Sequence, residues 1–245
     1  MQDGTERTCL RTQAPRVVGH KGAAHIEPGN TLQSFDAAMQ AGVDSIEFDV
    51  MSEHRDGSGR LVVAHDAEEL SRRPVLTLET ALEHMSRREF GSIELILDLK
   101  TPTRALEVFA RLSDAELIPR AMLSGASRSS LARIRAKAPE LRLLWTVPLV
   151  RRSSSWTPST MPAVAALTGY RALLPRRARE ALLRGRFDAI MAHWRVVTPA
   201  LLRAVRDGGG LLYVWTVDDA RLIAKLTELG VDGIITNDPR LFGPA

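Results

Sequence analysis

Short β-branched runs alternate with longer amphipathic stretches along most of this 245-residue chain. The short apolar runs predict buried strands, and apolar residues recurring every three or four positions predict helices. Repeated strand–helix units imply a mainly parallel sheet covered by helices. About eight such units in this length fit a single-domain α/β protein, a (β/α)8 TIM barrel, better than an open sheet. No Gly-x-Gly-x-x-Gly follows a predicted strand, which argues against a dinucleotide-binding sheet.

These two patterns, the short apolar runs and the helical spacing of apolar residues, predict where the strands and helices lie along the chain. Strands are expected at 16–19, 44–50, 61–64, 93–99, 121–123, 141–147, 189–192, 211–216 and 233–236. Helices are expected at 31–42, 76–85, 103–116, 128–138, 176–184, 199–207 and 219–229. The least regular region, 151–186, is expected to place a loop before its helix. We expect residues 1–14 to be a flexible N-terminal segment and residues 15–245 to be one barrel domain.

The charge pattern favours small anionic ligands over nucleic acid. The formal net charge is +4, and 29 of the 33 basic residues are arginine. Only 5% of the residues are aromatic, so the stacking platforms of a nucleic-acid groove are missing. No signal-peptide pattern follows Met1, and no apolar run approaches the ~18 residues of a membrane span. We therefore expect a cytoplasmic protein without integral membrane association; its oligomeric state stays open.

Polar residues at the ends of the predicted strands define a candidate site, because barrel enzymes carry their catalytic groups at the carboxyl ends of the strands. Alternate strand residues share a face, which pairs position 47 with 49 and position 98 with 100. The selected residues are His20, Glu47, Asp49, His65, Asp98 and Lys100. All of them map to one rim of the predicted barrel.

The residue types at this rim favour phosphate-ester chemistry. Three converging carboxylates repel one another and favour a divalent cation. Oxygen-only ligands suit one hard ion, Mg²⁺ or Ca²⁺, rather than zinc. Two histidines can divide the work of general base and general acid near neutral pH. Lys21 and Lys100 supply positive charge for a phosphate.

The same residues lie in segments that resemble the glycerophosphodiester phosphodiesterase family. The resemblance is strongest over 17–66, VVGHKGAAHIEPGNTLQSFDAAMQAGVDSIEFDVMSEHRDGSGRLVVAHD. There the family has a His-Arg-Gly start, a Pro-Glu-Asn-Thr segment, a Glu-x-Asp pair and a His-Asp pair. It resumes at ELILDLK, where the family has Glu-x-Lys, and at YVWTVDDARLIAKLTELGVDGIITNDP. The ordered match spans nearly the whole chain and is weakest between about 145 and 190.

The resemblance implies a metal-dependent phosphoric diester hydrolase that converts glycerophosphodiesters to glycerol 3-phosphate and an alcohol. It implies that a vicinal glycerol hydroxyl attacks first and that water opens the resulting cyclic phosphate. The order of the two histidines stays open, and we favour His20 as base and His65 as acid. Carried over by motif, the remaining roles are metal ligation by Glu47, Asp49 and Asp98, and substrate binding by Lys21, Lys100 and Trp215.

Departures from the family pattern keep two other functions open. Lys21 replaces an arginine, Gly29 replaces the glutamate of Pro-Glu-Asn-Thr, and Asp98 replaces a glutamate; Glu27 is a candidate substitute for the missing glutamate. The stretch 65–77 is also shorter than in many members, which predicts a more open pocket. The short stretch and Asp98 favour a lipid phosphodiesterase of lysophospholipase D or sphingomyelinase D type. The changes at 21 and 29 are the support for a non-catalytic phosphodiester-binding barrel.

Overall fold

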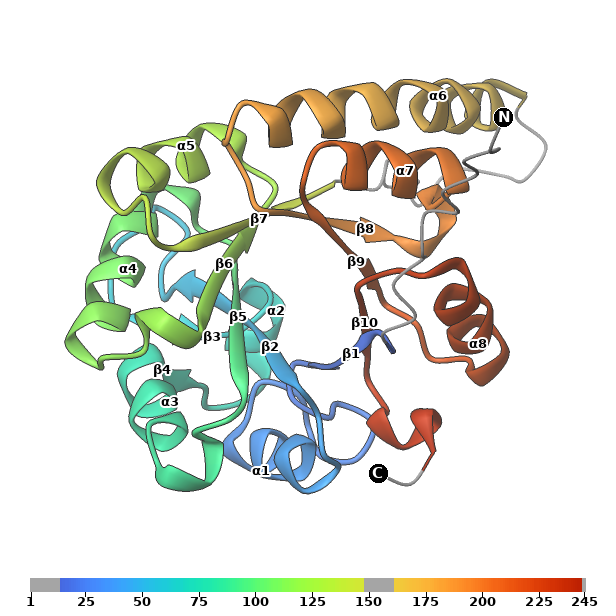
Figure 1. Ribbon diagram of the computed structural model, residues 1–245. Helices are drawn as coiled ribbons and strands as arrows, with labels where there is room; N and C mark the ends of the chain where they lie inside the picture. Colours follow the sequence, from blue (N-terminus) through green and yellow to red (C-terminus); the bar gives the residue numbers. More distant parts are fainter. Residues whose placement is uncertain (1–13, 148–160, 244–245) are drawn as a thin grey trace, which may run out of the picture.

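Eight parallel strands close into a barrel with helices around its outer side (Figure 1). The computed structural model describes residues 14–147 and 161–243. In these ranges the strands follow one another around the barrel, and β1 pairs with both β2 and β10 to close it. The barrel strands are β1 (Arg16–His20), β2 (Ser45–Ser52), β5 (Glu94–Leu99), β6 (Ala121–Gly125), β7 (Arg142–Thr146), β8 (Ala189–His193), β9 (Leu211–Trp215) and β10 (Gly233–Thr236). The predicted TIM barrel is confirmed.

The run predicted at 61–64 is a strand but does not belong to the barrel. It forms β3 (Leu61–Val63), which pairs antiparallel with the end of β2 and with β4 (Leu76–Thr77). The reason is the length of β2, which extends past the barrel and offers residues 51–52 as pairing partners. This small antiparallel extension lies beside the mouth of the barrel and carries the chain toward His65.

The helices begin where side-chain caps are available. Thr31 and Thr77 each cap a helix and accept from the backbone N–H of Ser34 and Thr80 at 3.1 and 3.2 Å. The helices are α1 (Leu32–Gln40), α2 (Ala67–Arg72), α3 (Leu78–Met85), α4 (Ala105–Asp114), α5 (Arg128–Lys137), α6 (Met161–Leu183), α7 (Pro199–Asp207) and α8 (Ala220–Leu229).

Two helices differ from the sequence expectation. Helix α6 begins at Met161 and continues through Pro175, so the expected start at 176 is wrong; Pro175 interrupts the helical pattern in the sequence without ending the helix. Helix α2 was not expected, and Asp66 caps its six residues. Residues 161–175 of the expected loop belong to α6, so that part of the loop prediction is wrong, and positions 151–160 lie outside the described residues. Nearly all of the expected segment 1–14 also lies outside them, so the domain boundary at 15 stays a prediction. Within the described ranges, no helix combines the length and apolar character needed to cross a membrane.

The barrel interior is apolar below and polar at the mouth. Eight buried side chains from seven of the barrel strands, two of them from β8 and none from β2, fill the lower interior: Val18, Ile96, Met122, Leu144, Ala189, Met191, Tyr213 and Ile235. Because every second strand residue points inward, the next inward position on four of these strands lies at the mouth. Those positions are occupied by His20, Asp98, Thr146 and Trp215. The strand period that builds the core therefore also aims polar side chains into the mouth.

Candidate active site

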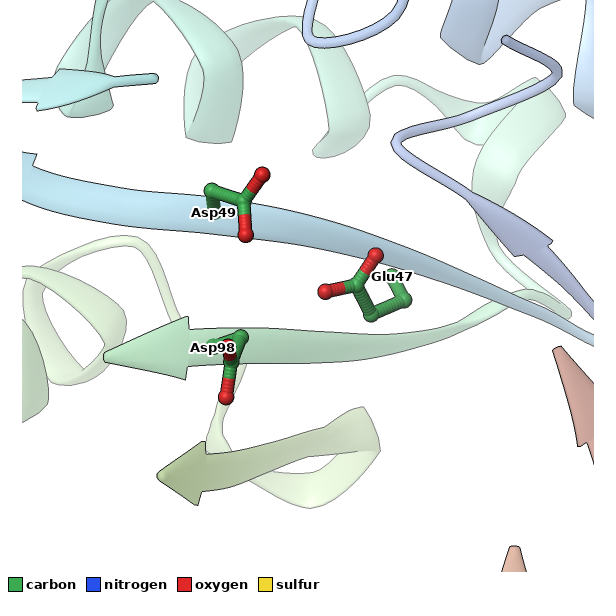
Figure 2. Close-up of side chains that lie close together, drawn as sticks. All are labelled: Glu47, Asp49 and Asp98. Carbon is green, nitrogen blue, oxygen red and sulfur yellow. The ribbon is translucent and has the colours of Figure 1, made fainter. Parts of the chain in front are cut away.

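Three buried carboxylates lie together near the carboxyl ends of β2 and β5. Glu47 and Asp49 are alternate residues of β2, and Asp98 lies opposite Asp49 in the parallel register with β5. Figure 2 shows the three side chains on these neighbouring strands. One carboxylate oxygen of each lies within 4.8 Å of the others, and none of the three residues is more than 8% exposed. The predicted acidic cluster is therefore present.

Each carboxylate uses one oxygen to hold its orientation. A backbone N–H, a side-chain amide and a hydroxyl donate to these three oxygens. The pairs are Lys21 N with Glu47 Oε2 at 3.1 Å, Asn30 Nδ2 with Asp49 Oδ2 at 3.0 Å, and Ser124 Oγ with Asp98 Oδ1 at 2.6 Å. The second oxygens are Glu47 Oε1, Asp49 Oδ1 and Asp98 Oδ2, and they stay available for a shared positive charge.

Lys100 supplies a positive charge at this point. Its Nζ lies 2.8 Å from Asp49 Oδ1 and forms an ion pair with Asp98 Oδ2. Burial disfavours the ammonium, but the carboxylates of Asp98, Asp49 and Glu47 outweigh burial and raise the pKa of Lys100. One ammonium thus contacts the second oxygens of two carboxylates.

The carboxylates of β2 differ in how readily they ionise. Burial raises the pKa of Glu47 well above its usual value, and the charges of Asp49 and Asp98 raise it further. Burial acts in the same direction on Asp49, but the Lys100 and Lys21 ammonium groups outweigh it and lower the pKa of Asp49 to about 2. Glu47 therefore keeps a proton to higher pH than a free glutamate does, whereas Asp49 stays charged.

His20 ends β1 and lies opposite Glu47 in the strand register. Its Nε2 is 3.9 Å from Glu47 Oε2, and its Nδ1 is 2.6 Å from Asn237 Oδ1. Burial lowers the pKa of His20, against the opposing effect of the hydrogen bond to Asn237 and the charge of Asp49. A histidine that favours its neutral form is suited to accept a proton.

His65 follows β3 and occupies the outer side of the same mouth. Its backbone N–H donates to Glu69 Oε2 at 2.8 Å, and its Nδ1 lies 3.0 Å from Asp66 Oδ2. Its side chain is 37% exposed, against 23% for His20. The two histidines therefore differ in environment: His20 is partly buried beside Glu47, while His65 has a carboxylate partner and more contact with solvent.

The turn after β1 explains why a glycine occupies position 29. Lys21 and Asn30 both have positive φ, 54° and 60°, and the Asn30 N–H donates to the Lys21 carbonyl at 2.9 Å. A Cβ at position 29 would lie 2.9 Å from the Cβ of Lys21, so a larger residue is excluded unless the turn moves. Glu27 is exposed, and no interaction among the described residues connects it to the carboxylate cluster. It is therefore not placed to substitute for the family glutamate.

A cavity of about 300 Å³ opens over the cluster. Six of the eight predicted site residues line it: His20, Glu47, His65, Asp98, Lys100 and Trp215. Asp49 lies beside them beneath Lys100, and Lys21 reaches the cluster through its Nζ, 3.5 Å from Asp49 Oδ2. Trp215 forms the opposite wall with Thr146 and Met191. The structure thus brings every predicted site residue to one mouth.

Several residues around the site were not selected from the sequence. Asn30, which is 1% exposed, fixes Asp49 by two hydrogen bonds, Nδ2 to Oδ2 and backbone N–H of Asp49 to Oδ1. Glu69 on α2 holds the His65 backbone, and Asn237 holds His20. These residues contact the selected ones rather than the cavity centre. Two signals could have pointed to Asn30: its place in the segment that matches the family's Pro-Glu-Asn-Thr, and its position after a glycine, where asparagine often adopts a positive φ.

Together, the closed parallel barrel and a mouth that combines carboxylates, histidines and lysines define a TIM-barrel hydrolase. The sequence matches the Glycerophosphoryl diester phosphodiesterase family over residues 20–114 and 100–241, and the chain belongs to this family. The resemblance seen in the sequence motifs is confirmed. The prediction of a phosphoric diester hydrolase is confirmed with it.

Curated relatives agree over most of the chain. A glycerophosphodiester phosphodiesterase of Arabidopsis thaliana is 25% identical over 93% of this chain and 72% of its own length. A glycerophosphodiester phosphodiesterase of Caldanaerobacter subterraneus is 26% identical over 91% of this chain and 94% of its own. The similarity is thus one of whole domains.

Solved structures show the same fold. A glycerophosphodiester phosphodiesterase structure from Parabacteroides distasonis superposes with a TM-score of 0.69 at 20% identity, over 93% of this chain and 94% of the other. A phosphodiesterase structure from Oleispira antarctica, in complex with the product sn-glycerol-3-phosphate, gives 0.66 at 21% identity, over 93% and 94% of the two chains. Because these sequence identities are low, the two matches show that the fold is shared and no more.

Proposed function

We propose that this chain hydrolyses glycerophosphodiesters to glycerol 3-phosphate and an alcohol, using His20 and His65 as the acid–base pair and one divalent cation. The observation that carries the proposal is the single cavity lined by both histidines, by Glu47 and Asp98, and by Lys100. Family membership and the names of the curated relatives support the substrate class. Cytoplasmic location stays a prediction from the sequence.

The donor set fits a hard cation. Glu47, Asp49 and Asp98 offer only oxygen, and each has one oxygen already held by a protein donor. The ammonium of Lys100 contacts second oxygens of two of these groups, so the site already accommodates positive charge there. We propose Mg²⁺ or Ca²⁺, which prefer such ligands. When bound, the cation would stabilise negative charge on the phosphoryl oxygens.

The two histidines divide the proton transfers. His20, neutral and facing the cluster, accepts the proton of the glycerol hydroxyl next to the phosphate ester. The freed oxygen attacks phosphorus, a five-membered cyclic phosphate forms, and the bond from phosphorus to the alcohol oxygen breaks. His65 donates a proton to that leaving oxygen. Because nucleophile and phosphorus belong to one molecule, the attack needs little additional ordering.

Ring opening reverses these roles. His65, now neutral, accepts a proton from water, and the hydroxide attacks the cyclic phosphate. The bond to the glycerol oxygen breaks, His20 returns its proton to that oxygen, and glycerol 3-phosphate leaves. Lys21 and Lys100 bind the phosphoryl oxygens through both steps, because their ammonium groups lie beside the carboxylate cluster. Trp215, on the opposite wall, would contact the alcohol.

Phosphorus NMR of glycerophosphoethanolamine turnover tests this scheme. We expect a transient cyclic glycerophosphate signal followed by glycerol 3-phosphate. His65→Ala should lower turnover by roughly 10²–10⁴-fold while cation binding persists, because His65 is not among the proposed ligands. His54→Ala, an exposed histidine, is the matched control and should behave as wild type. A fully active His65→Ala enzyme would show the acid–base assignment to be wrong.

A further inference from the structure

A chain of hydrogen bonds runs behind His20, away from the cavity. Asn237 follows β10, and its Oδ1 lies 2.6 Å from His20 Nδ1. The amide nitrogen of Asn237 lies 2.7 Å from Asp218 Oδ2, and the backbone N–H of Asn237 donates to Asp218 Oδ1 at 2.8 Å. Thr236 Oγ1 also donates to Asp218 Oδ1, at 3.1 Å. Three donors therefore hold the Asp218 carboxylate in place.

These hydrogen bonds determine which atoms of Asn237 and His20 donate and which accept. An ionised carboxylate accepts hydrogen bonds and donates none, so the Asn237 atom that faces Asp218 must be the amide nitrogen. The amide oxygen then faces His20, and it too can only accept. Nδ1 of His20 must therefore carry the proton. In the neutral imidazole this leaves Nε2 without one, on the side that faces Glu47.

We propose that Asn237, oriented by Asp218, is a positioning residue that holds His20 in its Nδ1–H tautomer and so makes Nε2 the base of the reaction. The inference rests on the proposed function, and it names two residues that act through His20. A general base needs a nitrogen with a free lone pair aimed at its substrate, and a third group commonly orients it. Asn237 provides this orientation with an uncharged acceptor, which fixes the tautomer without forming an ion pair with an imidazolium.

The tautomer can be observed without substrate or cation. Two-bond proton–nitrogen NMR spectra of the full chain labelled with ¹⁵N-histidine, in EDTA at about pH 8 where histidine is neutral, distinguish the protonated ring nitrogen from the bare one. The chain has six histidines, and His20→Gln identifies the signals of His20. We expect a protonated Nδ1 and a bare Nε2. A wild-type protein with the proton on Nε2 would overturn the proposal.

Variants at position 237 test the cause. Asn237→Ala removes the acceptor, so His20 should move wholly or partly to the Nε2–H form, whereas Asn237→Asp keeps an acceptor and should keep the Nδ1–H form. Asp219→Asn, next to Asp218 and without a bond to Asn237, is the matched control and should leave the His20 signals unchanged. An Asn237→Ala protein that is folded by circular dichroism and keeps the Nδ1–H signals would contradict the role of Asn237.

Kinetics complete the test. Asn237→Ala should lower kcat by about tenfold or more with KM nearly unchanged, because the variant still binds substrate but presents the wrong nitrogen. Wild-type kcat in this variant would remove the positioning role. The two levels of failure are distinct. An inactive wild-type protein with an Nδ1–H His20 would refute the proposed function alone, and an active one with an Nε2–H His20 would refute this inference alone.

Discussion

Lys100 and Asp49 form an ion pair inside the barrel mouth, with Nζ 2.8 Å from Oδ1. Asp49 is 1% exposed, and the same ammonium also pairs with Asp98. The proposed cation would use these same oxygens. Under the proposed function, Lys100 offsets part of the negative charge of the cluster when no cation is bound, and it would turn its ammonium to the phosphate when one is.

Replacing Lys100 should change stability and cation affinity in opposite directions. Without cation, Lys100→Met should unfold more easily by on the order of 2–3 kcal/mol, because it leaves buried carboxylates unpaired while Lys100 itself is partly exposed. The variant should bind Mg²⁺ or Ca²⁺ more tightly than wild type, since no ammonium competes. Denaturant melts and calorimetric titration measure both quantities, with exposed Lys137→Met as control. Weaker cation binding in Lys100→Met would contradict the shared use of these oxygens.

Cation affinity should rise with pH. The pKa of Glu47 is raised well above its usual value, and a cation binds only the deprotonated carboxylate. Binding must therefore release a proton at any pH below the raised pKa, and affinity should increase as the pH approaches it. Calorimetric titration in buffers of different ionisation enthalpy measures this proton. Glu47→Gln should bind weakly and lose the pH dependence; a wild-type affinity independent of pH would show that Glu47 is not a ligand.

The raised pKa of Glu47 also makes the stability of the cation-free protein depend on pH. Because folding raises the pKa of Glu47, the folded state binds more protons than the unfolded state above the unfolded value near 4.5. The Glu47 contribution to stability is thus fully present below that value and is lost as pH rises toward the folded pKa. The free energy of unfolding of Glu47→Gln relative to wild type should increase over this window. A difference that stays constant with pH would contradict the raised pKa.

Gly29 should resist enlargement although the family pattern has glutamate there. A Cβ would lie 2.9 Å from Lys21 Cβ and 3.1 Å from Ala24 Cβ. Gly29→Ala should therefore lower the free energy of unfolding by about 1–2 kcal/mol. Gly169→Ala in α6 has no heavy atom within 4 Å of the added Cβ, and helix propensity predicts a gain of about 0.5–1 kcal/mol. Thermal melts that show the same sign for both variants would rule out the steric explanation.

The barrel and its mouth were predictable from the sequence because one rule places both. Period-two alternation puts Val18 and Ile96 in the core, and the same alternation puts His20 and Asp98 at the rim. The role of β3 was not predictable in this way, since an apolar run of three residues looks the same inside or outside a barrel. Its place depends on how far β2 extends past the mouth.

The residues that hold the site in place were the harder part. Asn30 and Asn237 lie 19 and 217 positions along the chain from Asp49 and His20, the residues they bind. Glu69 binds the backbone of His65, four positions away, at the start of a helix that was not expected. None carries a periodic signal of its own, because each makes one or two specific hydrogen bonds rather than covering a face. The contacts of Asn30 and Asn237 follow from tertiary packing, so they appear only once the strand register is known.

Release of glycerol 3-phosphate from glycerophosphocholine is the measurement that bears most directly on the proposed function. The purified full chain would be assayed in EDTA and then with excess Mg²⁺, Ca²⁺ or Mn²⁺. We predict negligible release in EDTA and release restored by at least one of these cations, with Asp98→Asn strongly impaired under the same conditions. Folded protein that releases no glycerol 3-phosphate with any of the three cations, or that releases it equally well in EDTA, would contradict the proposed metal-dependent hydrolysis.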